Sequence, residues 1–182
     1  MKFFDEYFDL ISSQIKNIHS QQLLDAVEMI KRVKSLKGKV ILVGNGGSAA
    51  MASHISIDLT KNAGIRSVNF NEADLITCFA NDFGYDRWAE MAIEFYAAKE
   101  DVLIAISSSG KSENIINAAK KAKEMGISVI SFSGFDKDNP LSQLGDLNFW
   151  VDCRGYNIVE MTHHVWLVAI VDHLIGSIEY QA

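Results

Sequence analysis

Proline, cysteine and long apolar runs are all scarce in this sequence. One proline and twelve glycines occur among 182 residues, so no long flexible linker is expected. The two cysteines, Cys78 and Cys153, form no CxxC motif and are too few for a disulfide framework, so we expect buried free thiols in a reducing cytoplasm. The apolar run Val165–Ile175 is interrupted by Asp172 and His173 and is too short to span a bilayer.

Positive charge is also in the minority. The chain has 17 Lys and Arg against 23 Asp and Glu, a formal net charge of −6, which argues against nucleic acid or an anionic membrane as the main partner. The N-terminus carries charges inside its apolar stretch and has no small-residue cleavage site, which is not typical of a signal peptide. We therefore expect a cytoplasmic protein without a nucleic-acid or membrane partner. Phosphate can still bind such a protein through hydroxyls, amides and helix ends.

The elements that the sequence does predict alternate between helix and strand. Apolar residues recur at helical spacing between residues 4 and 33, which predicts two amphipathic helices within residues 1–37. The predicted strands are Val40–Val43, Ser67–Phe70, Val102–Ser107, Ser128–Phe132 and Leu147–Val151, and the predicted helices between them include Ala49–Lys61, Arg87–Ala98 and Glu113–Met125. Continuous apolar strands that alternate with helices imply a parallel sheet. We expect a single domain, in which residues 38–182 form a three-layer α/β/α sandwich with a five-stranded parallel sheet.

Two loops stand out at the predicted carboxyl edge of this sheet, where ligands of such sheets bind. The segment Gly44–Ser48 (GNGGS) follows the first strand and opens a helix, where glycines allow close backbone approach and helix N–H groups can meet an anion. A plain tight turn is the alternative. The segment Ser107–Ser112 (SSSGKS) follows the third strand, and its four hydroxyls with helix-terminal amides suit one phosphate monoester.

Nucleotide-binding motifs compete with this interpretation. Residues 44–49 fit the dinucleotide fingerprint G-x-G-x-x-A, and Glu72 could serve as the acid that binds the ribose. Residues 110–112 resemble the end of a Walker A loop, but the required first glycine would be Ala105. A dinucleotide fold does not call for the serine loop after the third strand, so we favour a sugar phosphate.

Three motifs together resemble a known family. These are the GNGGSA loop at residues 44–49, the segment Asn81–Gly84 (NDFG) and the segment Asp101–Asn114 (DVLIAISSSGKSEN). They resemble the sugar isomerase (SIS) family and, within it, the phosphoheptose isomerases. The resemblance implies conversion of sedoheptulose 7-phosphate to D-glycero-D-manno-heptose 7-phosphate for bacterial surface heptose, in lipopolysaccharide or capsule. It also implies a homotetramer with sites shared between subunits.

The resemblance also assigns substrate contacts. It implies that the sugar phosphate is bound by Asn45, Gly46, Gly47, Ser48, Asn81 and Asp82, with the phosphate on Ser107, Ser108, Ser109 and Ser112. The alternative from another class is a non-catalytic SIS protein, which binds the replication initiator DnaA or senses a sugar phosphate. Retention of polar groups on two helices favours the enzyme.

The family further implies a zinc site, one ion per subunit. Its histidine and glutamate after the first loop match His54 and Asp58, and its glutamine on the last helix matches Glu160. Its second histidine would fall at Val168, and His164, one turn earlier, could bring an imidazole into the same volume. Two histidines and two carboxylates would suit tetrahedral Zn²⁺, whereas a local His–Asp pair and a buried ion pair are the alternatives.

Isomerisation of a ketose requires a base beside the carbonyl carbon and an acid that moves protons between oxygens. We expect Asp58 as this base and His164 as its acid–base partner, with Glu160 in the same catalytic group. His163 is the weaker histidine candidate because its spacing from Glu160 is three residues rather than four.

Overall fold

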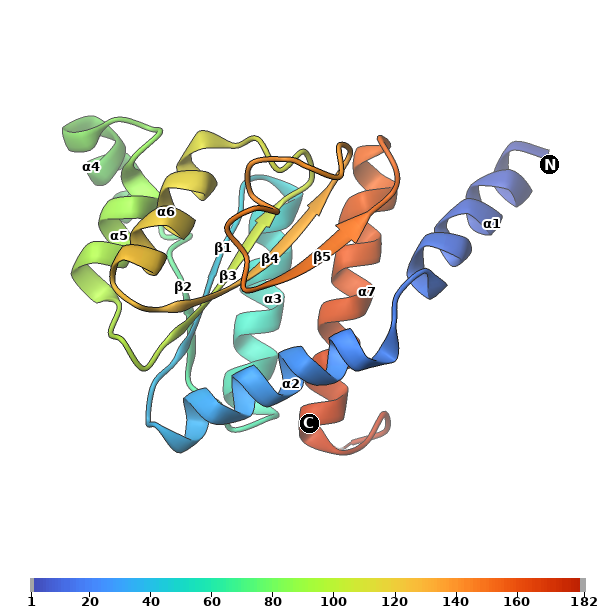
Figure 1. Ribbon diagram of the computed structural model, residues 1–182, viewed down its shortest axis with the longest axis horizontal. Helices are drawn as coiled ribbons and strands as arrows, with labels where there is room; N and C mark the ends of the chain where they lie inside the picture. Colours follow the sequence, from blue (N-terminus) through green and yellow to red (C-terminus); the bar gives the residue numbers. More distant parts are fainter. Residues whose placement is uncertain (1, 181–182) are drawn as a thin grey trace.

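The computed structural model describes residues 2–180 and contains one parallel sheet with helices on both faces (Figure 1). The strands are β1 (Val40–Val43), β2 (Ser67–Asn69), β3 (Val102–Ser107), β4 (Ser128–Gly134) and β5 (Leu147–Val151), in the spatial order β2-β1-β3-β4-β5. All four neighbouring pairs are parallel. The predicted five-stranded α/β fold is therefore confirmed.

The chain order reverses between β1 and β3, which lie side by side at the middle of the sheet. Val40 pairs with Val102 and Val43 pairs with Ala105, so both strands end at the same edge. The connection after β1 runs toward β2 on one side, whereas the strands after β3 extend the other side. Such a switch point leaves a crevice beyond the strand ends, where ligands of open parallel sheets bind.

Seven helices are described, and they cover the sheet in two layers. They are α1 (Lys2–Lys16), α2 (Ser20–Ser35), α3 (Gly47–Lys61), α4 (Ala73–Phe83), α5 (Trp88–Tyr96), α6 (Glu113–Glu124) and α7 (Tyr156–Ile175). One core lies between the sheet and α2, α3 and α7, and the other between the sheet and α5 and α6. Alternate residues of β1 pack into the two cores. Val40 and Leu42 belong to the first core, and Ile41 and Val43 belong to the second. Burial on both faces explains why the strand sequence is continuously apolar.

Helix α4 is an element that the sequence pattern did not predict. It buries no residue of its own, although Leu75, Ile76 and Phe79 pack on the edge of the second core. In chain order it lies between β2 and α5, and Figure 1 shows it beside α5 at the outer edge of the molecule.

The prediction of buried thiols is wrong. Cys78 is exposed and Cys153 is half-buried. Cys78 lies on α4, which does not enter the core, and Cys153 lies just beyond the end of β5, so neither residue occupies an interior position.

Helix α7 has the length and composition of a membrane-spanning helix, with a mean hydropathy of 1.3. It packs instead against α1, α2 and α3 and against β4 and β5. Apolar residues on several sides of this helix thus face protein, which is the behaviour of a core helix rather than of a membrane span.

Helix α1 projects from the body of the protein (Figure 1). It has no buried residue, and Phe3, Phe4 and Phe8 are 69%, 61% and 62% exposed. Only its C-terminal end is fixed by a long-range hydrogen bond, in which Trp166 Nε1 donates to the carbonyl oxygen of Ile15 at 2.9 Å.

Candidate active site

The loops after β1 and β3 enclose a small polar cavity at the switch point of the sheet. It has a volume of ≈ 120 Å³ and is lined by Asn45, Ser48, Ile106, Ser107, Ser108, Ser109, Ser112, Tyr156 and Glu160. Helices α3, α6 and α7 all begin at this edge of the sheet, next to these residues. Hydroxyl groups and helix N-termini together favour an anion of the size of one phosphate group.

The serine loop is a tight turn between β3 and α6. The N–H of Gly110 donates to the carbonyl oxygen of Ser107 at 2.9 Å, and Gly110 has φ +65°, a conformation that side chains disfavour. Ser107 Oγ donates to Ser112 Oγ at 3.0 Å, which closes the loop above the N-terminus of α6. The first and last hydroxyls of the loop are thereby brought to one place.

The first loop is fastened to α6 by a pair of amides. Asn45 Nδ2 donates to Asn114 Oδ1 at 2.9 Å, and Asn114 Nδ2 donates to Asn45 Oδ1 at 2.8 Å. Tyr85 also donates its hydroxyl to Asn45 Oδ1, at 3.3 Å. Asn114 is only 3% exposed, so this pairing satisfies an amide that would otherwise be buried without partners. Much of the hydrogen-bonding capacity of Asn45 is therefore used to hold the two loops together.

A polar seam runs from the cavity along the contact between α3 and α7. At the cavity end the carboxylate of Glu160 lies against Gly47, where an added Cβ would collide with it. Further along both helices, His54 faces His164, with ring centroids 5.0 Å apart. Because an α-helix rises 1.5 Å per residue, His164 lies ~6 Å along the helix beyond Glu160.

Three side chains of the seam form a hydrogen-bonded chain. Asp58 Oδ2 is 3.1 Å from His54 Nε2, and His54 Nδ1 is 2.8 Å from His164 Nε2. If Asp58 accepts the proton of His54 Nε2, the Nδ1 atom of His54 becomes the acceptor for a proton on His164 Nε2. The free nitrogen of His164 is then a proton acceptor. The side chain of His54 is 51% exposed, whereas that of Asp58 is 19% exposed.

The pKa of His164 is lowered, chiefly because burial penalises the charged imidazolium and then because His54 repels it, whereas Asp58 raises the pKa. A neutral His164 at pH 7 is the form that can accept a proton. His163 differs: it is fully buried, its Nε2 lies 2.9 Å from the carbonyl oxygen of Ser133, and burial lowers its pKa to about 4. Of the two neighbouring histidines, His164 is therefore the one that faces the seam.

The arrangement does not form a ready zinc site. Within residues 2–180, no three His, Cys, Asp or Glu side chains surround a common point where an ion could bind. Asp58 contacts the ring nitrogen of His54 that faces away from His164, and Glu160 lies at the cavity end of the seam against Gly47. The residues present thus do not fit a four-ligand zinc centre in this geometry.

The predicted substrate contacts are placed in two groups. The cavity is lined by Asn45, by Ser48 and by all four serines of the serine loop. Gly46 and Gly47 lie beside it at the start of α3. Asn81 and Asp82 do not line it, because they lie near the exposed end of α4 and hydrogen-bond to each other at 2.9 Å.

Three residues with a role at the cavity were not predicted from the sequence: Tyr85, Asn114 and Tyr156. Asn114 ends the SxN sequence of the serine loop, and Tyr85 follows the NDFG segment, so each lies beside a predicted motif. Their position next to a motif indicated that they lie near the cavity. The sequence pattern did not indicate where their side chains point.

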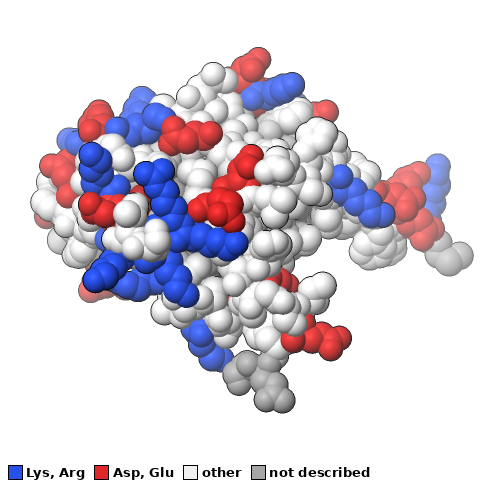
Figure 2. All heavy atoms as spheres, turned by 60° about the horizontal axis from the view of Figure 1, so that its bottom comes forward, with Lys and Arg blue, Asp and Glu red and all other residues white. Residues whose placement is uncertain are grey.

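Basic side chains are absent from the described wall of the cavity. No Lys or Arg is among its described lining residues. Figure 2, which brings the opposite end of the molecule forward, shows Lys and Arg gathered on that face instead. Arg32 and Lys99 line a separate cavity of ≈ 330 Å³, together with Glu100 and Asp101. The groups that this cavity offers to an anion are therefore hydroxyls and backbone dipoles.

Comparison with known proteins identifies the family. The family model described as "SIS domain" matches residues 2–134. The chain belongs to the SIS domain family. The phosphoheptose isomerase of Aliarcobacter butzleri is 39% identical over 139 residues, which cover 72% of this chain and 73% of that enzyme. That of Mycobacterium tuberculosis is 30% identical over 179 residues, which cover 92% of this chain and 90% of that enzyme.

A solved SIS structure agrees over nearly the whole chain. The phosphoheptose isomerase of Neisseria gonorrhoeae has a TM-score of 0.87 and 25% identity, covering 96% of this chain and 97% of that one. The predicted family and isomerase class are thus confirmed. The dinucleotide alternative is set aside, since Glu72 lines a different cavity, with Phe70 and Phe79, rather than the one beneath the GNGGS loop.

Proposed function

We propose that this SIS isomerase interconverts sedoheptulose 7-phosphate and D-glycero-D-manno-heptose 7-phosphate. The observation that carries the proposal is a phosphate-sized cavity of ≈ 120 Å³ whose wall includes Glu160, one turn of α7 before the His164 that contacts His54. A sugar held by its terminal phosphate would extend its other end away from the serine loop, toward these groups. The related phosphoheptose isomerases support the choice of substrate.

The phosphate end is bound by the serine loop and by the starts of three helices. Ser107, Ser108, Ser109 and Ser112 offer hydroxyl groups, and the N-terminus of α6 offers free N–H groups. Such binding acts equally on substrate and transition state, so it mainly sets KM. Its mechanistic role is to fix the position of the reacting carbons relative to the seam.

Glu160 and His164 carry out the proton transfers. Both lie on α7, one turn apart, with Glu160 in the cavity wall and His164 farther from the phosphate. In this mechanism His164 carries the proton between C1 and C2, and Glu160 exchanges protons with the sugar oxygens. Asp58 acts through His54, by fixing the tautomer that leaves His164 basic. This changes the role expected for Asp58 from base to orienting group.

Further properties belong to the same proposal. We expect a cytoplasmic homotetramer that supplies heptose for lipopolysaccharide or capsule. The exposed phenylalanines of α1 and the half-exposed side chain of His54 support this, because a partner subunit would cover such groups. Zn²⁺ stays a prediction, and the steps above use only side chains.

The test is turnover of sedoheptulose 7-phosphate, followed by NMR of the products with and without a chelator. His164→Asn should lower kcat by about 100-fold or more, because positioned acid–base groups contribute on the order of 10²–10⁴. His173→Asn is the matched control, since His173 is an exposed histidine on the same helix. It should leave kcat unchanged.

Asp58→Asn tests the hydrogen-bonded chain. It should lower kcat with little change in KM, and the double variant with His164→Asn should be no slower than His164→Asn alone, because the residues act as a unit. Full turnover by His164→Asn would rule out its role. A wild-type protein that binds sedoheptulose 7-phosphate without converting it would instead favour a non-catalytic SIS protein.

A further inference from the structure

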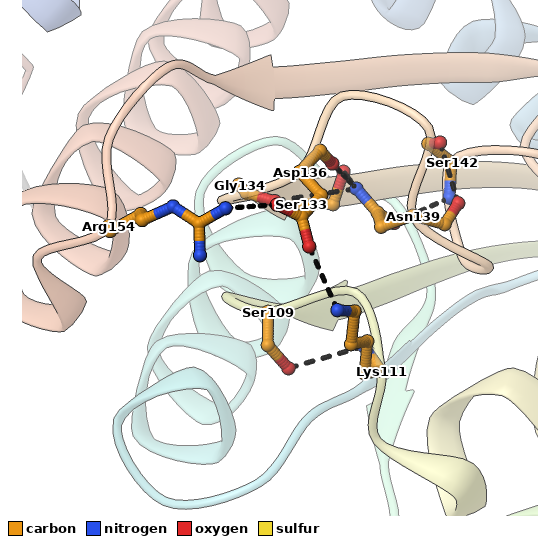
Figure 3. Close-up of polar contacts among 8 residues, drawn as sticks. All are labelled: Ser109, Lys111, Ser133, Gly134, Asp136, Asn139, Ser142 and Arg154. Carbon is orange, nitrogen blue, oxygen red and sulfur yellow. Dashed lines mark hydrogen bonds and ion pairs between the residues drawn. The ribbon is translucent and has the colours of Figure 1, made fainter.

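A second loop, residues 135–142, holds the tip of the serine loop (Figure 3). The N–H of Leu141 donates to the carbonyl oxygen of Gly110 at 3.1 Å. The side chain of Asn139 lies so close to Gly110 that a Cβ there would collide with it. Gly110, with a φ of +65° that favours glycine, is thus enclosed by the loop of residues 135–142, so the two loops cannot change shape independently.

Asn139 gives the second loop its rigidity. It is 1% exposed, and its Nδ2 donates to Ser133 Oγ at 3.0 Å and to the carbonyl oxygen of Asp136 at 2.8 Å. Its Oδ1 accepts from the N–H of Ser142 at 2.9 Å. A buried amide with all these partners fixes one conformation, because any other would leave polar groups unpaired.

Asp136 connects this loop to the serine loop by charge. Its carboxylate lies between Lys111 Nζ, at 2.8 Å, and the guanidinium of Arg154 (Figure 3). The hydrogen bond from Lys111, followed by the charge of Arg154, lowers the pKa of Asp136, so the carboxylate stays ionised. Lys111 therefore points to Asp136 and does not line the phosphate cavity.

We propose that Asp136 and Asn139 are positioning residues for the phosphate of the substrate. Lys111 supports the serine loop through its ion pair with Asp136 and does not bind the phosphate. Asp136 and Asn139 keep Gly110 and Lys111 in the conformation that presents the serine hydroxyls to the cavity. This inference rests on the proposed sugar-phosphate function and adds to it a second loop that no substrate atom needs to touch.

The deciding variant is Asp136→Asn, with Asp138→Asn as its matched control. Asp138 is exposed and makes no hydrogen bond or ion pair within residues 2–180, so both variants remove the same charge two residues apart. Asp136→Asn should raise KM for sedoheptulose 7-phosphate about threefold to fivefold, with kcat within about twofold, the range of one partly exposed ion pair. Asp138→Asn should leave both unchanged.

A lower KM in Asp136→Asn would show that Lys111 can bind the phosphate. If Asp136 merely withheld a phosphate ligand, Asp136→Asn would free Lys111 and lower KM, which overturns the proposal. The Lys111→Met, Asp136→Asn double variant should have the same KM as Asp136→Asn alone.

Asn139→Ser is a second variant that does not alter charge. It should raise KM about tenfold with kcat little changed, and should weaken binding of inorganic phosphate in calorimetry by a similar factor. Unchanged KM in a folded variant, checked by circular dichroism, would also overturn the proposal. Failure of the proposed function is a separate result, since it would appear in the wild-type protein as absence of turnover.

Discussion

Acidification should destabilise this protein through one buried side chain, His163. Its imidazole is fully buried between β4 and the rest of α7, with Phe132 at 5.5 Å and Trp166 at 6.2 Å between ring centroids. One ring nitrogen contacts the carbonyl oxygen of Ser133, and the other, Nδ1, has no hydrogen-bond partner among residues 2–180. Protonation would place an uncompensated charge in this apolar site.

The magnitude follows from the pKa. Burial lowers the pKa of His163 from 6.5 to about 4. Between these values the unfolded chain binds a proton that the native state does not, so stability falls as the pH falls from about 6.5 toward 4. At about 1.4 kcal/mol per pKa unit, the loss reaches ~3 kcal/mol. Above pH 7 both states are neutral, and the residue contributes no pH dependence.

Urea unfolding of the wild type and of His163→Gln, at several pH values between 7.5 and 4.5, isolates this contribution. Carboxylates with lowered pKa values, such as Glu90 and Asp146, also lose stabilising contacts in acid, but they are common to both proteins. A chelator in all samples removes any metal contribution. The difference in free energy of unfolding should shift by ~2.5 kcal/mol in favour of the variant as the pH falls from 7.5 to 4.5.

A pH-independent difference between the two proteins would refute this reasoning. If His163→Gln does not fold, the wild type alone decides the matter by NMR. The imidazole of His163 should remain neutral at pH 5.5, and a ring that titrates near 6.5 would contradict the buried, neutral state.

Two further predictions concern the loops at the cavity. Asn114→Ala should lower the free energy of unfolding by about 1–2 kcal/mol, because it leaves the amide of Asn45 without its partner, and should raise KM; urea unfolding and initial-rate kinetics measure both effects, and unchanged values would show that the amide pair is unimportant. Gly47→Ala should retain the fold, since alanine is favourable in a helix, but should lower kcat about tenfold or more by displacing the carboxylate of Glu160. A fully active Gly47→Ala enzyme would show that the position of Glu160 is not critical.

The sequence predicted most of the fold because the central strands β1 and β3 are buried along their whole length and therefore consist of continuous apolar runs. The predicted β1, β3 and β5 have the observed bounds, since each is a short, mainly apolar run that directly follows a charged residue. Helix α4 escaped prediction because it lies on the edge of the second core and buries no residue completely. The order of the strands could not be read from the pattern, because it depends on which side of β1 each connection returns.

The candidate site was predictable to the level of loops and helix faces, but not of atoms. Spacing placed His54 and Asp58 on one face of α3, and the structure brings His164 opposite them. The side on which Asp58 meets the imidazole depends on rotamers, which no spacing encodes. The contact of residues 135–142 with Gly110 was likewise unpredictable, because it joins loops whose sequences carry no periodic pattern.

Three helices start at one edge of the sheet, and this should determine how the affinity for the phosphate group varies with pH. Partial positive charges on peptide groups neither gain nor lose protons between pH 5 and 9, and no lysine or arginine is among the described residues of the cavity wall. The part of phosphate recognition that comes from these helix ends should therefore track ionisation of the ligand itself, whose second pKa is ~6. Through these dipoles the enzyme senses the protonation state of its substrate, in a wall that also holds the carboxylate of Glu160.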